Sequence, residues 1–276
     1  MTPSKRRRPG KTGAVTRRVA VMGAAGRMGR TVCAAVVDDP DCELVAAVDP
    51  HHAGLDISTV AGVDSDVVVA ADVGTLEDAG VDVAVDFTEA SAARDNLRWC
   101  AGAGVHAVVG TTGLSDDDLD ELRSLFTRSN CVVAPNFAIG AVLMMRFAEL
   151  AAPWFETVEI IELHHDAKVD APSGTAVATA HRIAAASGEW AQDPTTDTVL
   201  EGARGGSGPA GIPIHAVRLR GLVAHQEVLF GTTGQTLSVR HDTTDRSSFM
   251  PGVLLAVKGV ADRPGVTLGL DALLGL

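Results

Sequence analysis

The chain has 276 residues, a formal net charge of −12, 46% hydrophobic residues, 29 glycines and no tyrosine. No apolar run reaches the roughly 20 residues that a membrane-spanning helix needs, so the composition argues against a membrane protein. An acidic chain repels the phosphate backbone, which argues against nucleic acid as a main partner. With few aromatic side chains, the core is expected to be aliphatic, as in a parallel sheet covered by helices.

The N-terminal segment, residues 1–17, is basic, and we expect it to be a disordered extension. A nucleic-acid-binding arm is the alternative interpretation. The apolar stretch that follows is short and runs directly into a glycine-rich turn, which argues against a secretory signal.

Residues 18–136 alternate short apolar strands with helical patterns. VAVMG and ELVAAVD are predicted strands, and the helix RMGRTVCAAVVDD lies between them. Further strands are predicted at residues 67–73, 81–87, 106–109 and 131–134. One helix is predicted after Thr88 and another from Ser115, where three aspartates in the first turn suit the helix dipole. This alternation predicts a Rossmann-like, doubly wound parallel sheet in an α/β fold.

The pattern changes after about Asn136. A helix is predicted over residues 140–151, and the segments TVEIIELHH, IPIHAVRLRG, HQEVLFG and QTLSVRHDT then alternate apolar with polar residues. Such alternation is typical of a largely antiparallel sheet with one covered face. Residues 188–211 are rich in Gly, Pro, Thr and Asp and are predicted to form a long loop.

An apolar helix near residues 251–260 is expected to return to the first domain. The prediction is therefore a first domain of residues 18–136 and 247–276, with an inserted α+β domain of residues 137–246. The four cysteines form no C-x-x-C pair, so we expect buried, reduced thiols in a cytoplasmic protein and no metal site. A zinc site built from them is the weaker alternative.

The segment GAAGRMG has the character of a dinucleotide site. Glycines at this spacing, between a strand and a helix, allow a tight turn, close approach of a pyrophosphate and close helix packing. Asp49 ends the next strand, where it can accept hydrogen bonds from ribose hydroxyls. A tight turn without a ligand is the alternative. The predicted cofactor contacts here are Gly23, Ala24, Ala25, Gly26, Arg27, Met28 and Asp49.

The carboxylate of Asp49 would repel a 2′-phosphate, which favours NADH over NADPH. Arg27, His51 and His52 are nearby groups that could instead reach a phosphate. Two strand ends, VVGTTG and VVAPNF, are expected to contact the nicotinamide half, because ligands bind at the carboxyl ends of parallel strands. Ordinary turn chemistry is the alternative. The residues concerned are Gly110, Thr111, Thr112, Ala134, Pro135, Asn136 and Phe137.

The segment HHDAKVDAPSGTA combines two histidines, a lysine and a helix start. His164 and His165 lie at a predicted strand end, where they face opposite sides. Ser173 is a natural N-cap that leaves the next two amides free, so that with Lys168 the helix start can bind a carboxylate or phosphate. Histidine can transfer a proton near neutral pH.

Three simpler interpretations of this segment remain open. The histidines can be ordinary residues at a strand end. They can form half of a metal site with Asp166 or Asp170. Lys168 and Asp170 can form a surface ion pair.

Together, VAVMGAAGRMGR, GTTG, APNF and ELHHDAKVDAPSGTA resemble the dihydrodipicolinate reductase (4-hydroxy-tetrahydrodipicolinate reductase) family from about Arg18 to the C-terminus. The resemblance implies NAD(P)H-dependent reduction of 4-hydroxy-tetrahydrodipicolinate (dihydrodipicolinate) to tetrahydrodipicolinate in lysine biosynthesis by the diaminopimelate pathway. Alternatives are an NADH-dependent reductase of another keto or imino acid, a nucleotide-sensing protein, and a metal hydrolase.

The resemblance also implies roles for individual residues. His164 corresponds to the proton donor and acceptor, and Lys168 to a second proton donor that also binds substrate. The resemblance implies a dinucleotide-binding domain made of residues 18–136 and 247–276. It implies that residues 137–246 bind substrate and assemble a homotetramer through their sheet. The remaining substrate contacts expected are His165, Ser173, Gly174, Thr175 and Arg246.

Overall fold

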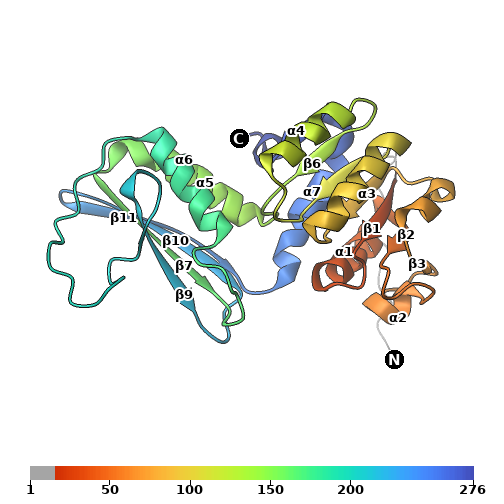
Figure 1. The fold of residues 1–276 in the computed structure, drawn as a ribbon, viewed down its shortest axis with the longest axis horizontal. Helices are drawn as coiled ribbons and strands as arrows, with labels where there is room; N and C mark the ends of the chain where they lie inside the picture. The colour runs from red at the N-terminus through yellow and green to blue at the C-terminus, as the bar shows by residue number, and fades with distance from the viewer. Residues whose placement is uncertain (1–15) are drawn as a thin grey trace. The chain divides into compact units, whose positions relative to one another are not determined.

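The computed structural model describes residues 16–276, which form two compact units (Figure 1). Unit 1 contains the described residues up to Ala134 together with Val253–Gly269, and unit 2 contains Pro135–Gly252 and Leu270–Leu276. Residues 270–276, which the sequence analysis placed in the first domain, thus belong to unit 2. One reason is the bidentate ion pair between Arg182 and Asp271.

Of the predicted N-terminal extension, residues 1–17, the first fifteen lie outside the described residues. Arg17, the last residue of that predicted segment, is already part of a strand. Its backbone amide donates to the carbonyl of Asp41 at 2.8 Å, and it pairs with Cys42 of the neighbouring strand. Strand β1 therefore begins at Arg17, one residue before the predicted start of the first domain.

Unit 1 is built on a seven-stranded sheet in the order β12-β6-β5-β4-β1-β2-β3, in which every neighbouring pair is parallel. Residues 19–22 of β1 are fully buried, as expected for a strand covered on both faces. The Rossmann-like α/β prediction is confirmed. The strands are β1 (Arg17–Met22), β2 (Cys42–Val48), β3 (Val69–Ala70), β4 (Val83–Asp86), β5 (His106–Val109), β6 (Cys131–Val133) and β12 (Val266–Leu268).

The helices of unit 1 connect these strands. Ser115 caps α4 through a capping box, in which its side chain accepts the Asp118 amide while the Asp118 carboxylate accepts the Ser115 amide. Only the first residues of α7 lie in unit 2. The elements are α1 (Arg27–Asp38), α2 (Ile57–Ala61), η1 (Val73–Ala79), α3 (Ala90–Ala103), α4 (Asp116–Leu125), α7 (Met250–Gly259) and η5 (Val260–Asp262).

Unit 2 has a five-stranded sheet in the order β11-β10-β7-β9-β8. It is largely antiparallel as predicted, although β7 and β9 run parallel. Figure 1 shows α5 and α6 side by side over this sheet. The strands are β7 (Thr157–His164), β8 (Gly206–Ser207), β9 (Pro213–Arg218), β10 (Ala224–Thr232) and β11 (Gln235–Thr243). The helices are α5 (Ile139–Ala151), η2 (Ala152–Trp154), α6 (Gly174–Ala186), η3 (Pro209–Gly211), η4 (Arg246–Phe249) and α8 (Asp271–Leu274).

Alternation along β7 determines which side chains face the helices. Val158, Ile160 and Glu162 are buried, and the residues between them are partly exposed. A carboxylate therefore lies on the apolar face of the sheet, two residues before His164. The site in unit 2 is built around this carboxylate.

The four cysteines are free and buried, as expected. Burial raises the pKa of the Cys33 thiol to about 12 and that of Cys42 to about 11. Within residues 16–276, none of the helices combines the length and apolar composition of a transmembrane span.

Candidate active site

The glycine turn of unit 1 has the shape of an anion cradle. Gly23 adopts a positive φ of 71°, and a Cβ on Gly29 would lie 2.0 Å from the Gly23 carbonyl oxygen. Gly26 is the N-cap of α1 and supplies no side-chain cap, so the amides of Arg27 and Met28 have no acceptor within the helix. These residues fit a dinucleotide, whose diphosphate the free amides would bind.

Asp49 lies beside this turn, at the end of β2, and its side chain is largely buried. Its carboxylate accepts the amide of Ala25 at 3.2 Å and that of His51 at 3.1 Å, and lies 2.9 Å from Nδ1 of His52. Burial raises the pKa of Asp49, but these hydrogen bonds outweigh burial and lower it. The carboxylate is therefore held in its charged form, and His52 is directed toward it.

Thr111 belongs to a buried hydrogen-bond network after β4 and β5. Its hydroxyl donates to Oδ1 of Asp86 at 3.0 Å. The same carboxylate accepts the amide and hydroxyl of Thr88 at 2.8 and 2.7 Å, and Nδ2 of Asn96 at 2.8 Å. Asp86 is 1% exposed. It therefore fixes the loops that follow β4 and β5, at the carboxyl end of the sheet that carries the glycine turn.

Sequence reasoning missed the segment Asp86–Thr88. A Cβ on Gly110 would lie 2.0 Å from the Phe87 ring, and one on Gly23 would lie 3.1 Å from the Thr88 side chain. The sequence contained a sign of this segment. Polar residues follow the predicted strand 81–87, as they do the two strands that end at GTTG and APNF. Thr112, by contrast, is exposed.

The segment APNF lies at the junction of the two units. Ala134 ends the first part of unit 1, and Pro135 begins unit 2. The Asn136 side chain accepts the Ala138 amide at 2.8 Å and donates to the hydroxyl of Thr175 at 3.3 Å. Phe137 is buried. Asn136, a predicted cofactor contact, thus also contacts a predicted substrate residue.

A small pocket of about 40 Å³ in unit 2 brings several predicted residues together. His164 enters it from β7, and Ser173 and Thr175 from the start of α6. His225 and His241 also line it, and the sequence analysis did not select them because each is a single histidine in an alternating strand. The lining residues are Asn136, Ala141, Met144, His164, Ser173, Thr175, Ala224, His225, Gln226, His241, Thr243 and Phe249.

His164 contacts a buried ion pair formed by Glu162 and Arg218. Its Nδ1 lies 2.6 Å from Oε2 of Glu162, which is fully buried. Arg218 donates to both oxygens of this carboxylate at 2.8 Å, and the Ser173 amide donates at 3.0 Å. Burial lowers the pKa of His164, and Lys168 and Arg218 lower it further, against the opposing effect of Glu162.

Sequence reasoning missed Glu162 as well. Its position two residues before His164 could have indicated it, since residues two apart on a strand share a face. Burial raises the pKa of Glu162, and hydrogen bonds from Arg218 and His164 outweigh burial and lower it. The carboxylate is held in its ionised form.

Lys168 forms the ion pair that was one of the simpler interpretations. Its Nζ lies 2.7 Å from both carboxylate oxygens of Asp170, and this contact lowers the pKa of Asp170. His165 is half-buried, and its carbonyl accepts the Lys168 amide. Within residues 16–276, no group of three or more His, Cys, Asp or Glu side chains is placed to hold a metal ion.

The start of α6 has the predicted cap. The Ser173 hydroxyl accepts the Ala176 amide at 3.2 Å, which leaves the amides of Gly174 and Thr175 at the helix end. Arg246 begins η4, the short helix that ends at the pocket residue Phe249. Of the residues predicted to act in catalysis or substrate binding, the pocket is lined by His164, Ser173 and Thr175. Its lining does not include His165, Lys168, Gly174 or Arg246.

Two protein-family models match this chain in succession. The model of the N-terminus of dihydrodipicolinate reductase matches residues 17–137, and the model of its C-terminus matches residues 140–274. The chain belongs to the dihydrodipicolinate reductase family. The resemblance seen in the sequence motifs is thereby confirmed, and membership of the family extends over both units.

Individual members of the family are similar over almost their whole length. The 4-hydroxy-tetrahydrodipicolinate reductase of Cutibacterium acnes is 51% identical over 265 residues, which cover 94% of this chain and 99% of that protein. The enzyme of the same name from Nocardia farcinica is 50% identical over 268 residues, 95% and 100% of the two chains. Dipicolinate-bound dihydrodipicolinate reductase from Paenisporosarcina sp. TG-14 superposes with a TM-score of 0.82 at 41% identity, over 94% and 99% of the two chains.

Proposed function

We propose that this protein catalyses the NAD(P)H-dependent reduction of 4-hydroxy-tetrahydrodipicolinate to tetrahydrodipicolinate, in lysine biosynthesis by the diaminopimelate pathway. The observation that carries the proposal is the pocket in unit 2 where His164 meets the capped start of α6. The start of α6 offers free amides to a carboxylate beside His164. A related structure of the same family is described as dipicolinate-bound.

The substrate carboxylates would be held by two groups of donors. The amides of Gly174 and Thr175, with Ser173, would bind one carboxylate at the start of α6. Lys168 would exchange its present partner Asp170 for a substrate oxygen. His165 and Arg246 complete the proposed substrate contacts, by correspondence with the family.

His164 would hold and transfer the proton. Its ring lines the pocket and is anchored on the far side by Glu162. Lys168 would be the second proton donor. When bound, the reduced nicotinamide would supply the hydride. The protein's own groups would orient the substrate ring and deliver the one proton that balances the hydride, and the 4-hydroxyl group would leave as water.

The cofactor contacts would be provided by the glycine turn, by Asp49 and by the strand ends at residues 110–112 and 134–137. We propose NADH as the preferred cofactor, with NADPH also accepted. The carboxylate of Asp49 supports this preference, because its low pKa keeps a negative charge where a 2′-phosphate would otherwise be placed. Arg27 is exposed in the same turn and is the group that would allow NADPH.

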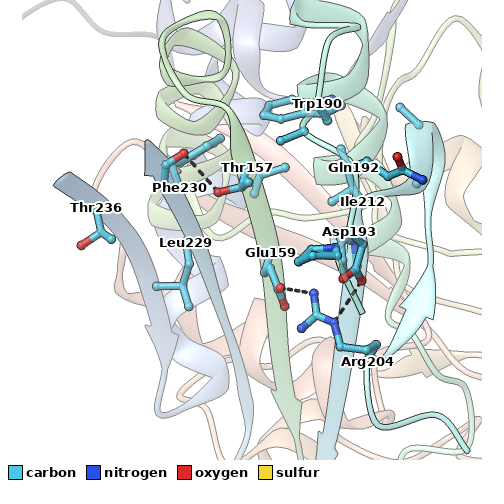
Figure 2. Close-up of a pocket in the computed structure, with 17 residues that line it drawn as sticks. Thr157, Glu159, Trp190, Gln192, Asp193, Arg204, Ile212, Leu229, Phe230 and Thr236 are labelled. Carbon is cyan, nitrogen blue, oxygen red and sulfur yellow. Dashed lines mark hydrogen bonds and ion pairs between the residues drawn. The ribbon is translucent and has the colours of Figure 1, made fainter. Parts of the chain in front are cut away.

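We also propose a cytoplasmic homotetramer that assembles through the sheet of unit 2. Free, buried cysteines are consistent with a reducing compartment. One face of the sheet is covered by α5 and α6, whereas on the other face Leu229 remains 37% exposed. Figure 2 shows a pocket of about 670 Å³ at this sheet, with a lining that includes Leu229, Trp190 and Arg204, in which Arg204 bridges Glu159 and Asp193. Such a partly apolar face with fixed charges suits a second copy of the chain.

The test is an absorbance assay at the NADH band, with dihydrodipicolinate synthase supplying the substrate. We expect the absorbance to fall only when the synthase product is present, and faster with NADH than with NADPH. Turnover of another keto or imino acid but not of this product would overturn the proposed substrate. Binding of NADH without turnover of any candidate would indicate a nucleotide-sensing protein.

A further inference from the structure

We propose that Glu162 is a positioning residue that fixes the His164 ring with Nδ1 protonated and turned to the carboxylate, so that Nε2 exchanges the proton with substrate. Arg218 in turn fixes Glu162. The inference deepens the proposed function and rests on it for its catalytic consequence, but the geometry concerns the protein alone.

The tautomer follows from the hydrogen bonds that Glu162 accepts. Its Oε2 lies 2.6 Å from Nδ1 of His164 and accepts from Arg218, and its Oε1 accepts from Arg218 and from the Ser173 amide. An ionised carboxylate only accepts hydrogen bonds. At 2.6 Å the proton must therefore lie on Nδ1, which leaves Nε2 as the only ring nitrogen that can serve the substrate.

The ionised state of Glu162 is fixed by its surroundings. The side chain is fully buried on the apolar face of β7, where a carboxylate without partners is strongly disfavoured. Arg218, opposite His164 on the parallel strand β9, supplies two parallel hydrogen bonds and a compensating charge. The Arg218 guanidinium also donates to the Asp170 carbonyl at 2.6 Å, and this second partner fixes its position further.

The same carboxylate links the two parts of the proposed site. By accepting the Ser173 amide, it fixes the N-cap of α6, whose next amides face the proposed substrate carboxylate. The proton-transfer group and the anion-binding helix end therefore share one buried anchor. A displacement of Glu162 would move both of them.

The test replaces Glu162 with glutamine, which keeps the shape and removes the charge. The amide would face His164 with a donor, and the ring would change to the Nε2–H tautomer. We expect kcat to fall by about 10²–10⁴-fold, the range for loss of a general acid or of its correct tautomer, with KM changed much less. Histidine ¹⁵N–¹H correlation spectra, with the His164 signals assigned by their loss in His164→Asn, should show Nδ1–H in the wild type and Nε2–H in Glu162→Gln.

The matched control is Asp271→Asn, which removes another carboxylate held by two hydrogen bonds from one arginine in unit 2, outside the pocket lining. We expect its kcat and the His164 spectrum to be unchanged. An Nε2–H tautomer at His164 in the wild type overturns the proposal, even if Glu162→Gln does not fold. Wild-type kcat in a folded Glu162→Gln does so as well. Failure of the wild type to reduce the substrate would overturn the proposed function only, since the tautomer is measured without substrate.

Discussion

Replacing Arg218 with methionine should strongly destabilise unit 2. The substitution removes two hydrogen bonds of 2.8 Å to a fully buried carboxylate and leaves the Glu162 charge without its guanidinium partner. Breaking a buried ion pair from one side typically costs about 3–5 kcal/mol in the free energy of unfolding. For a protein of this size, that corresponds to a fall in Tm of about 6–20 °C.

The destabilisation should depend on pH in a defined direction. In the wild type the pKa of Glu162 is lowered in the folded state, so its contribution to stability is present above the unfolded-state pKa and is lost as the pH falls. In Arg218→Met the largest cause of that lowering is absent, and burial raises the pKa. The difference in Tm between the two proteins should therefore increase from pH 5 to pH 7.5.

Thermal unfolding followed by circular dichroism at both pH values measures this effect. The control is the double variant Glu162→Gln with Arg218→Met, which no longer buries a charge and should recover most of the lost Tm. An Arg218→Met protein as stable as the wild type would refute the reasoning. So would a double variant no more stable than Arg218→Met.

Three further predictions concern the proposed activity. His164→Ala should lower kcat by about 10²–10⁴-fold in the NADH assay while NADH binding is retained, and near-normal kcat would remove His164 from the mechanism. Asp49→Ser should raise the ratio of kcat/KM for NADPH to that for NADH by about tenfold, because it removes a charge that repels the 2′-phosphate; an unchanged ratio would contradict the role of Asp49. Gly29→Ala places a Cβ 2.0 Å from the Gly23 carbonyl oxygen, so α1 must shift. The Kd for NADH, measured by fluorescence, should therefore rise at least about tenfold. The control is Gly102→Ala, which should leave this Kd unchanged because a Cβ at Gly102 meets nothing within 4 Å.

Features set by neighbouring residues were predictable from the sequence. The Ser115 capping box and the Ser173 N-cap depend on atoms three residues away, so the residue types alone identify them. The glycine turn is similar, because the constraint at Gly29 comes from Gly23 in the same turn. The start of β1 at Arg17 was harder to predict from the sequence. A charged residue does not continue the apolar pattern, although its backbone pairs with β2.

Features that depend on strand register could not be predicted in this way. Arg218 reaches Glu162 only because β9 runs parallel to β7 and brings residue 218 opposite His164. IPIHAVRLRG alternates like an antiparallel strand, and nothing local reveals its partner or direction. The polar end of the strand that carries Asp86 was visible in the sequence, but its partners were not, because Asn96 and Thr111 come from separate elements.

With His164 as the proposed proton donor, the charges around the pocket account for how a histidine with a lowered pKa would supply a proton. Lys168 is paired with Asp170, and Arg218 with Glu162, so neither of these two cations offers an unbalanced charge to a dicarboxylate while His164 is neutral. Binding of a dianion therefore favours the imidazolium, in which Nδ1 donates to Glu162 and Nε2 donates to the substrate. Under the proposed mechanism, proton uptake by His164 would thus be coupled to binding of the substrate that uses the proton. The lowered pKa of His164, caused mainly by burial, favours the neutral ring before the dicarboxylate binds.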